Sequence, residues 1–210
     1  MKRLFIVLGL VMLVACQKNP STVMTNDTDK VFPEAVGTHW AYQVMDTTLY
    51  NFYPDSFTVA VDTVHIEIVK RSTSNDGTTE FIWQVDTPEG RDSVFVKMTS
   101  DTLVAISTRH THFTMAFTLV LPLDEGKTWQ DEFAAYQTTL VNRLDLPMGR
   151  INNVYAIRQQ PILEGNIAGA NWYYIKPGIG LVQYIYRVFI TVVETNHRMT
   201  WRLMTYTTPR

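Results

Sequence analysis

Two histidines offer the most evident chemistry in the sequence, because His110 and His112 are separated by a single residue. On a β-strand, side chains two residues apart project from the same face, so both imidazoles could reach one Zn²⁺ ion. A third ligand would have to come from elsewhere, such as His65, His197 or a carboxylate. The other interpretation is a polar turn between two strands. We favour the turn and expect no metal and no cofactor, with His110 and His112 as the candidate pair.

Other catalytic patterns are missing from the sequence. Glycoside hydrolysis requires two carboxyl groups that face each other across a cleft. The sequence has two pairs of adjacent carboxylates, Asp124–Glu125 and Asp131–Glu132, but adjacency does not predict that geometry. We interpret both pairs as solvent-exposed charges in turns. No G-x-S-x-G motif supplies a nucleophilic serine. We therefore expect a protein that is not an enzyme, with a metal-assisted hydrolase as the alternative.

The only cysteine, Cys16, follows a segment typical of an export signal. Lys2 and Arg3 give a positive start, and the uncharged run that follows them is too short for a membrane-spanning helix of about 20 residues. Leu13-Val14-Ala15-Cys16 resembles the lipobox of bacterial lipoproteins.

This resemblance implies that Cys16 carries a diacylglycerol, with acyl chains such as palmitate, after cleavage of the signal peptide over residues 1–15. Each buried CH₂ group contributes about 0.8 kcal/mol, so two or three chains hold a domain firmly on a membrane. The membrane is then a partner through lipidated Cys16. In many Gram-negative lipoproteins, an Asp after the cysteine retains the protein in the inner membrane. Gln17 stands here, which favours the outer membrane, with a periplasmic or cell-surface orientation left open.

Composition narrows the remaining function classes. The formal net charge is −2, and no block of lysine and arginine residues occurs, so nucleic-acid binding is excluded. Hydrophobic residues make up 46% of the chain and aromatic residues 12%, enough for a substantial core. Once Cys16 is used for the anchor, no cysteine remains for a disulfide, so the core must hold the fold together.

The polarity of the chain changes near residue 32. Residues 16–31 are rich in Ser, Thr, Asn and Asp, which is typical of a flexible tether behind the lipidated cysteine. Residues 32–210 are rich in Val, Ile, Thr, Tyr, Phe and Trp in period-two alternation. We predict a single all-β domain there, a mostly antiparallel meander forming a curved half-barrel or barrel-like sheet, with a β-sandwich as the alternative.

Local patterns within this domain give further expectations. Phe57, Val59 and Val61 have the opposite parity to Val64 and the residues that follow, which predicts a bulge or turn near residues 62–63. Residues 195–197 are expected to turn the last two strands into a hairpin, and residues 131–135 could form one helical turn. The strand over residues 180–194 is apolar in both phases, which predicts cover on both faces.

Three motifs recur in order along the domain. They are G-x-x-W-x-Y over residues 37–42, PL-x-x-G-x-x-W over residues 122–129, and the segment KPGIGLV over residues 176–182. Together they resemble a set of uncharacterised β-rich secreted and lipid-anchored bacterial proteins. The resemblance implies a fold and carries no agreed activity.

The aromatic residues in and near these motifs are candidate core or pocket residues: Trp40, Tyr42, Trp129, Trp172 and Tyr174. Core packing is the favoured interpretation, and an aromatic-lined ligand pocket is the other. The combined expectation is a non-enzymatic lipoprotein of the cell envelope that binds an apolar ligand, a glycan or an envelope protein. The alternative is a structural subunit of an envelope assembly.

Overall fold

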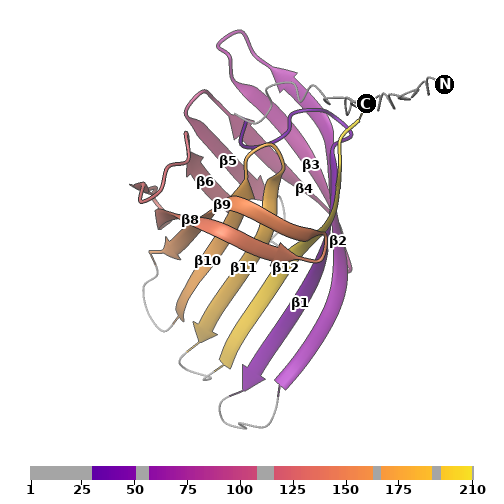
Figure 1. Ribbon diagram of the computed structural model, residues 1–210, viewed down its shortest axis with the longest axis vertical. Coiled ribbons are helices and arrows are strands. Elements are labelled where there is room, and N and C mark those ends of the chain that lie inside the picture. The colour runs from indigo at the N-terminus through magenta and orange to yellow at the C-terminus, as the bar shows by residue number, and fades with distance from the viewer. Residues whose placement is uncertain (1–29, 51–56, 108–115, 163–166, 191–194, 210) are drawn as a thin grey trace, which may run out of the picture.

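The computed structural model of the protein describes residues 30–50, 57–107, 116–162, 167–190 and 195–209. Within these residues there are twelve β-strands and no helix, which confirms the all-β prediction (Figure 1). The strands are β1 (His39–Tyr50), β2 (Phe57–Thr73), β3 (Thr79–Thr87), β4 (Gly90–Met98), β5 (Thr102–Ser107), β6 (Ala116–Val120), β7 (Thr128–Gln130), β8 (Ala134–Leu146), β9 (Gly149–Pro161), β10 (Ile167–Lys176), β11 (Gly180–Ile190) and β12 (Thr195–Thr207).

All twelve strands belong to one antiparallel sheet, in the order β6-β5-β4-β3-β2-β1-β12-β11-β10-β9-β8-β7. Neighbours along the chain are neighbours in the sheet, except that β1 pairs with β12 and that β6 and β7 are the two edges. The sheet curls into a nearly closed barrel shape (Figure 1). The barrel-like prediction is therefore confirmed, and the β-sandwich alternative is wrong because the strands form a single sheet.

The core fills the inner face of this curled sheet. Successive residues of a strand point to opposite faces, so the alternating apolar residues of each strand converge inward. The largest fully buried side chains are aromatic, and several are in ring contact: Tyr42 with Trp201 at 5.8 Å between ring centroids, and Tyr173 with Tyr184 at 5.0 Å. Such pairs stabilise the core beyond the area that they bury.

Strand β2 corrects one of the expectations above. It runs without interruption from Phe57 to Thr73, and its pairing with β1 has no register shift near residues 62–63. The predicted bulge is therefore wrong there. The change of parity instead means that Phe57, Val59 and Val61 face outward and are exposed, whereas Val64 and the alternate residues after it face the core. The irregularity lies further along, between Ile68 and Lys70, in the pairing with β3.

The β8–β9 hairpin crosses the outer face of the sheet. Figure 1 shows β8 and β9 passing in front of β10, β11 and β12. The Arg202 guanidinium donates to the carbonyl oxygen of Asp145 at 2.8 Å, and the Met148 N–H donates to the Leu203 carbonyl at 3.4 Å. Residues 181–184 of β11 are all buried, so the predicted cover on both faces is confirmed for that part of the strand.

Two details of the chain ends complete the fold. The Phe32 ring packs among buried aromatic side chains, 5.3 Å from the Trp83 ring, and lies so close to Gly180 that a Cβ there would be 2.5 Å from it. Gly180 also has φ +90°, which a residue with a side chain rarely adopts. At the other end, the last two strands, β11 and β12, pair in antiparallel fashion, so the predicted hairpin is confirmed. Residues 195–197 are paired strand residues of β12, so the turn was predicted at the wrong residues.

Candidate functional site at the seam of the sheet

The two edges of the sheet meet at a seam, where side chains of β7, β9 and β10 reach the carbonyl groups of β6. The Trp129 indole N–H donates to the Thr118 carbonyl at 3.0 Å. The Ala116 carbonyl accepts from the Gln159 amide at 3.3 Å and from the Tyr173 hydroxyl at 3.0 Å. Because an unpaired edge strand exposes carbonyl groups, these side chains replace the backbone partner that β6 lacks on this side.

A polar network lies directly behind the seam. The Gln159 side-chain N–H donates to the Tyr136 hydroxyl oxygen at 3.0 Å, and the Tyr136 hydroxyl donates to the Asp131 carboxylate at 2.9 Å. The Gln159 carbonyl oxygen accepts from Asn171 at 2.7 Å and lies 2.9 Å from the Tyr173 hydroxyl. Gln159 is buried, and its amide is satisfied only because these partners converge on it.

The pKa values in this network are shifted away from neutral pH. Partial burial disfavours the Asp131 carboxylate, but hydrogen bonds from the backbone of Phe133 and Ala134 and from Tyr136 outweigh it, so the pKa of Asp131 is lowered. Burial, assisted by the bond to the Asp131 carboxylate, raises the pKa of Tyr136 to about 12. Asp131 is therefore ionised and Tyr136 protonated at neutral pH, which suits a fixed hydrogen bond and not proton transfer.

The turn between β7 and β8 positions Asp131. Its carboxylate accepts the N–H groups of Phe133 and Ala134, both at 2.8 Å, and its own N–H donates to the Ala134 carbonyl at 3.0 Å. A short side-chain acceptor that caps its own turn is what favours Asp at such a position. The helical turn expected over residues 131–135 is wrong, because this turn connects two paired strands.

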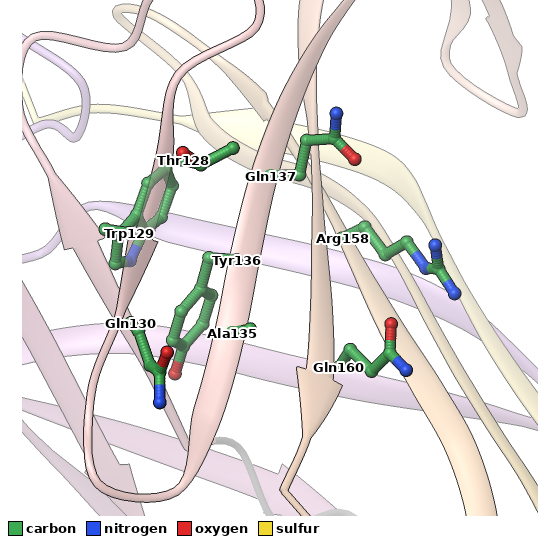
Figure 2. Close-up of a pocket in the computed structure, with 8 residues that line it drawn as sticks. All are labelled: Thr128, Trp129, Gln130, Ala135, Tyr136, Gln137, Arg158 and Gln160. Carbon is green, nitrogen blue, oxygen red and sulfur yellow. The ribbon is translucent and has the colours of Figure 1, made fainter.

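A polar groove of about 440 Å³ lies along β7, β8 and β9 (Figure 2). Register places Gln137 opposite both Thr128 and Arg158, and Ala135 opposite both Gln130 and Gln160. The small side chain of Ala135 therefore leaves a hollow between longer polar ones. Trp129 and Tyr136, whose rings stack at 5.2 Å with 6° between their planes, complete the lining.

The chemistry of the polar groove is that of a hydrogen-bonding surface. Three primary amides, each with donors and an acceptor, stand around the Arg158 guanidinium and the Thr128 hydroxyl, and the lining includes no carboxylate. Trp172, on the neighbouring strand β10, lies directly opposite Arg158 of β9. A half-buried indole therefore lies beside the groove on the same face of the sheet.

The structure places the predicted aromatic residues in different surroundings. Trp40 and Tyr42 are buried, and both donate to β11 or the turn before it: Trp40 to the Ile179 carbonyl at 2.7 Å and Tyr42 to the Leu181 carbonyl at 2.8 Å. Trp129 is half-buried at the seam. Trp172 and Tyr174 are half-buried on the outer face, whereas the residue between them, Tyr173, is the buried one.

The anchor and metal candidates lie elsewhere. Cys16, His110 and His112 are outside the described residues. Of the possible third ligands, His65 stacks on His39, and His197 lies 2.6 Å from the Asp46 carboxylate. In the part of the chain that the structure describes, no group of three or more His, Cys, Asp and Glu side chains could hold a metal ion.

Sequence reasoning missed the polar residues of the seam. Gln159 has the same parity as the buried Ile157, so a polar residue at an inward-facing position was the available signal. Gln137, Arg158 and Gln160 alternate with inward-facing residues and read as an ordinary solvated face. Their assembly into a groove depends on the register of three strands, which the sequence does not display.

Comparisons with known proteins bear on the fold. No protein-family model matches the sequence, and no curated protein matches it. The structure is similar to that of a "putative lipoprotein" from Parabacteroides distasonis, with a TM-score of 0.51 and 12% identity over 85% of this chain and 99% of that one. It is also similar to a "putative exported protein with YmcC-like fold" from Bacteroides fragilis, with a TM-score of 0.51 and 10% identity over 84% of this chain and 98% of that one.

These similarities show a shared fold. The first of these structures is described as a "putative lipoprotein" and the second as a "putative exported protein", and both descriptions are consistent with the lipobox-like segment of this chain. Within the described residues, no helix is both long and apolar enough to span a membrane.

Proposed function

We propose that the protein is a lipid-anchored, non-enzymatic protein of the bacterial cell envelope that binds a glycan in the polar groove. We infer a glycan from the lining of that groove, in which three glutamine side chains, Arg158 and Thr128 surround a hollow at Ala135. Sugar hydroxyls both donate and accept hydrogen bonds, as do primary amides.

Arg158 and Trp172 support the same ligand class. A guanidinium presents several donors in a fixed plane, which matches neighbouring oxygens on a sugar ring or the carboxylate of an acidic sugar. An indole beside it offers a flat apolar surface for the C–H face of a sugar. The strands hold these groups on a rigid scaffold, which reduces the ordering that binding would require.

A binding role fits the seam better than a catalytic one. The ionisable pair nearest the groove is Asp131 with Tyr136, and the opposite directions of their pKa shifts keep both groups in one protonation state around neutral pH. An acid–base catalyst needs a pKa near the working pH. The hydrolase alternative therefore has no support from this pair.

The anchor is tested with Cys16→Ser in the full chain. We expect the wild-type protein to fractionate with membranes, with the outer-membrane fraction as the specific expectation, and to take up labelled palmitate. The Cys16→Ser protein should lose the label. Retention of both label and membrane fractionation by the variant would contradict lipidation at Cys16.

The ligand is tested by screening the full-length protein, embedded in lipid nanodiscs, against an array of neutral and acidic glycans. For a glycan that binds, Arg158→Ala should weaken binding by about tenfold or more, and Gln137→Ala by about three- to tenfold, because each removes hydrogen bonds of the corresponding strength. The matched control is Arg187→Ala, an exposed arginine on β11, two strands away. Binding that Arg158→Ala and Arg187→Ala change equally, or no binding to any glycan, would overturn this proposal.

A further inference from the structure

The outer face of strands β3 to β6 exposes apolar side chains that do not line the polar groove. Phe95 is 54% exposed and Ile106 is 58% exposed, and both lie on the solvent side of the sheet. Single exposed apolar residues are ordinary, but contiguous ones mark a surface that another molecule covers. Their arrangement therefore decides whether they form a site.

Strand register aligns these residues in a row. Ile82 of β3 is directly opposite Phe95 of β4, and Phe95 is directly opposite Ile106 of β5. The row continues to Lys70 on β2 at one end and to Ala116 on β6 at the other. Directly opposite residues share a face of the sheet, so one straight row crosses five strands.

A second row runs parallel to the first, two residues further along each strand. It consists of Ser72, Glu80, Lys97, Val104 and Thr118. Between the two rows lies a hollow of about 400 Å³ over β2 to β5. A neighbouring hollow of about 540 Å³ shares Val104 and Ile106 with it and extends to the seam. The two form one apolar groove that ends at Phe133, which is 70% exposed.

Charge differs between the two ends of this apolar groove. At the β2 end stands Lys70, and the other lysine, Lys97, lies directly opposite Glu80, which offsets its charge. At the seam end the lining includes Asp131 and Glu132. An anionic group is therefore favoured at the β2 end and repelled at the seam end.

The dimensions of the apolar groove also match a lipid chain. Four steps between neighbouring strands separate Lys70 from Ala116, which is about 19 Å at about 4.8 Å per step. One leaflet of a bilayer has a hydrocarbon thickness of about 15 Å, half of the core. A single extended acyl chain would thus lie across β3 to β6 with room for its head group.

We propose that the apolar groove binds a single-chain amphiphile with an acidic head group, such as a long-chain fatty acid. The head group lies at Lys70, and the chain extends past Phe95 and Ile106 toward the seam. The two grooves share Tyr136, but Lys70, Phe95 and Ile106 line only the apolar groove, so the two proposals are tested through different residues.

The test is photochemical labelling of the full-length protein in nanodiscs of zwitterionic lipid, with a diazirine-bearing palmitic acid as the probe. We expect adducts on peptides that contain Phe95 or Ile106. Phe95→Ser and Ile106→Thr keep the strands intact and should each lower that labelling several-fold. Val61→Ser is the matched control, because Val61 is 58% exposed on the outer face of β2 outside the apolar groove.

A separate experiment tests the position of the head group at Lys70. Lys70→Gln should reduce labelling by palmitic acid about three- to tenfold, by loss of a charge-assisted contact, and leave labelling by the corresponding diazirine-bearing alcohol unchanged. Equal labelling of peptides around Val61 and around Phe95, or no labelling of the groove peptides, would overturn the site. Equal loss for acid and alcohol in Lys70→Gln would overturn the orientation of the amphiphile.

Discussion

Strands β1 and β12 join along a backbone ladder with one bulge, between Ala41 and Tyr42, and all twelve residues of β1 have a partner in β12. Across the seam, by contrast, the carbonyl groups of Ala116 and Thr118 on β6 bind side chains of other strands. A ladder uses groups that every residue except proline carries, so it tolerates substitution. A seam closed by side chains depends on particular residues, and this dependence makes the comparison testable.

The largest effect on stability is expected at the buried face of β12. Trp201 of β12 is fully buried and contacts the rings of Tyr42 and Tyr184 at 5.8 and 5.6 Å. Trp201→Ala should lower the free energy of unfolding by about 3–5 kcal/mol, the usual cost of deleting a buried aromatic side chain. Denaturant unfolding measures it. Trp129→Ala, on the half-buried seam tryptophan, should cost less, and the reverse order would contradict this account of the core.

The second effect concerns the centre of the seam network. Gln159→Leu keeps the size of the side chain but removes the partners of Asn171, Tyr136 and the Ala116 carbonyl. Removing these hydrogen bonds from a buried network should lower the free energy of unfolding by about 1–3 kcal/mol. Gln160→Leu, at the neighbouring exposed position, serves as the control in the same denaturant titration. Equal effects of the two substitutions would show that the network does not contribute to stability.

A matched pair of hydroxyl deletions compares the two regions directly. The Tyr42 hydroxyl donates to the Leu181 carbonyl near the ladder, and the Tyr173 hydroxyl donates to the Ala116 carbonyl at the seam. Tyr42→Phe and Tyr173→Phe should each cost about 1 kcal/mol in denaturant unfolding. A cost near zero for Tyr173→Phe, together with the full cost for Tyr42→Phe, would show that the seam bond is dispensable.

The smallest effect is in acid. In the folded protein, the pKa of Asp131 lies below its ordinary value of 3.8. The stability that the carboxylate contributes is therefore present above about pH 3.8 and is lost as the pH falls through the folded-state pKa. Asp131→Asn cannot titrate and should make the stability of the protein fall less steeply below pH 3.8. Thermal melting over pH 2–5 measures this slope. An identical slope in both proteins would contradict the role assigned to the carboxylate.

The sequence predicts the ladder region better than the seam. Alternation of apolar and polar residues identifies the strands, because inward packing imposes a period of two on each of them. Alternation alone wrongly predicts an interruption of β2, because Phe57, Val59 and Val61 continue an apolar pattern on its outer face. An exposed apolar row and a register slip give the same change of parity, and only the pairing with β1 distinguishes them.

The seam could not be predicted because particular side chains make its contacts, and no alternation of residue types identifies their partners. Tyr173 is 57 residues from Ala116, and Gln159 is 43 residues from it. Their meeting depends on how far the sheet curls, which is a property of all twelve strands together. The same reason hides the polar groove, since Gln137 and Arg158 become neighbours only through the register of β8 and β9.

Hydrogen–deuterium exchange tests the central claim, that side chains close the sheet at the seam. Exchange would be followed in the full-length protein, in the double variant Tyr173→Phe/Gln159→Leu, and in Tyr42→Phe. Relative to Tyr42→Phe, we expect the double variant to show faster exchange of backbone amides in β5, β6 and β7 and the same exchange in β1 and β12. Uniformly faster exchange across all strands, or no change in β6, would show that the seam is not closed by these side chains.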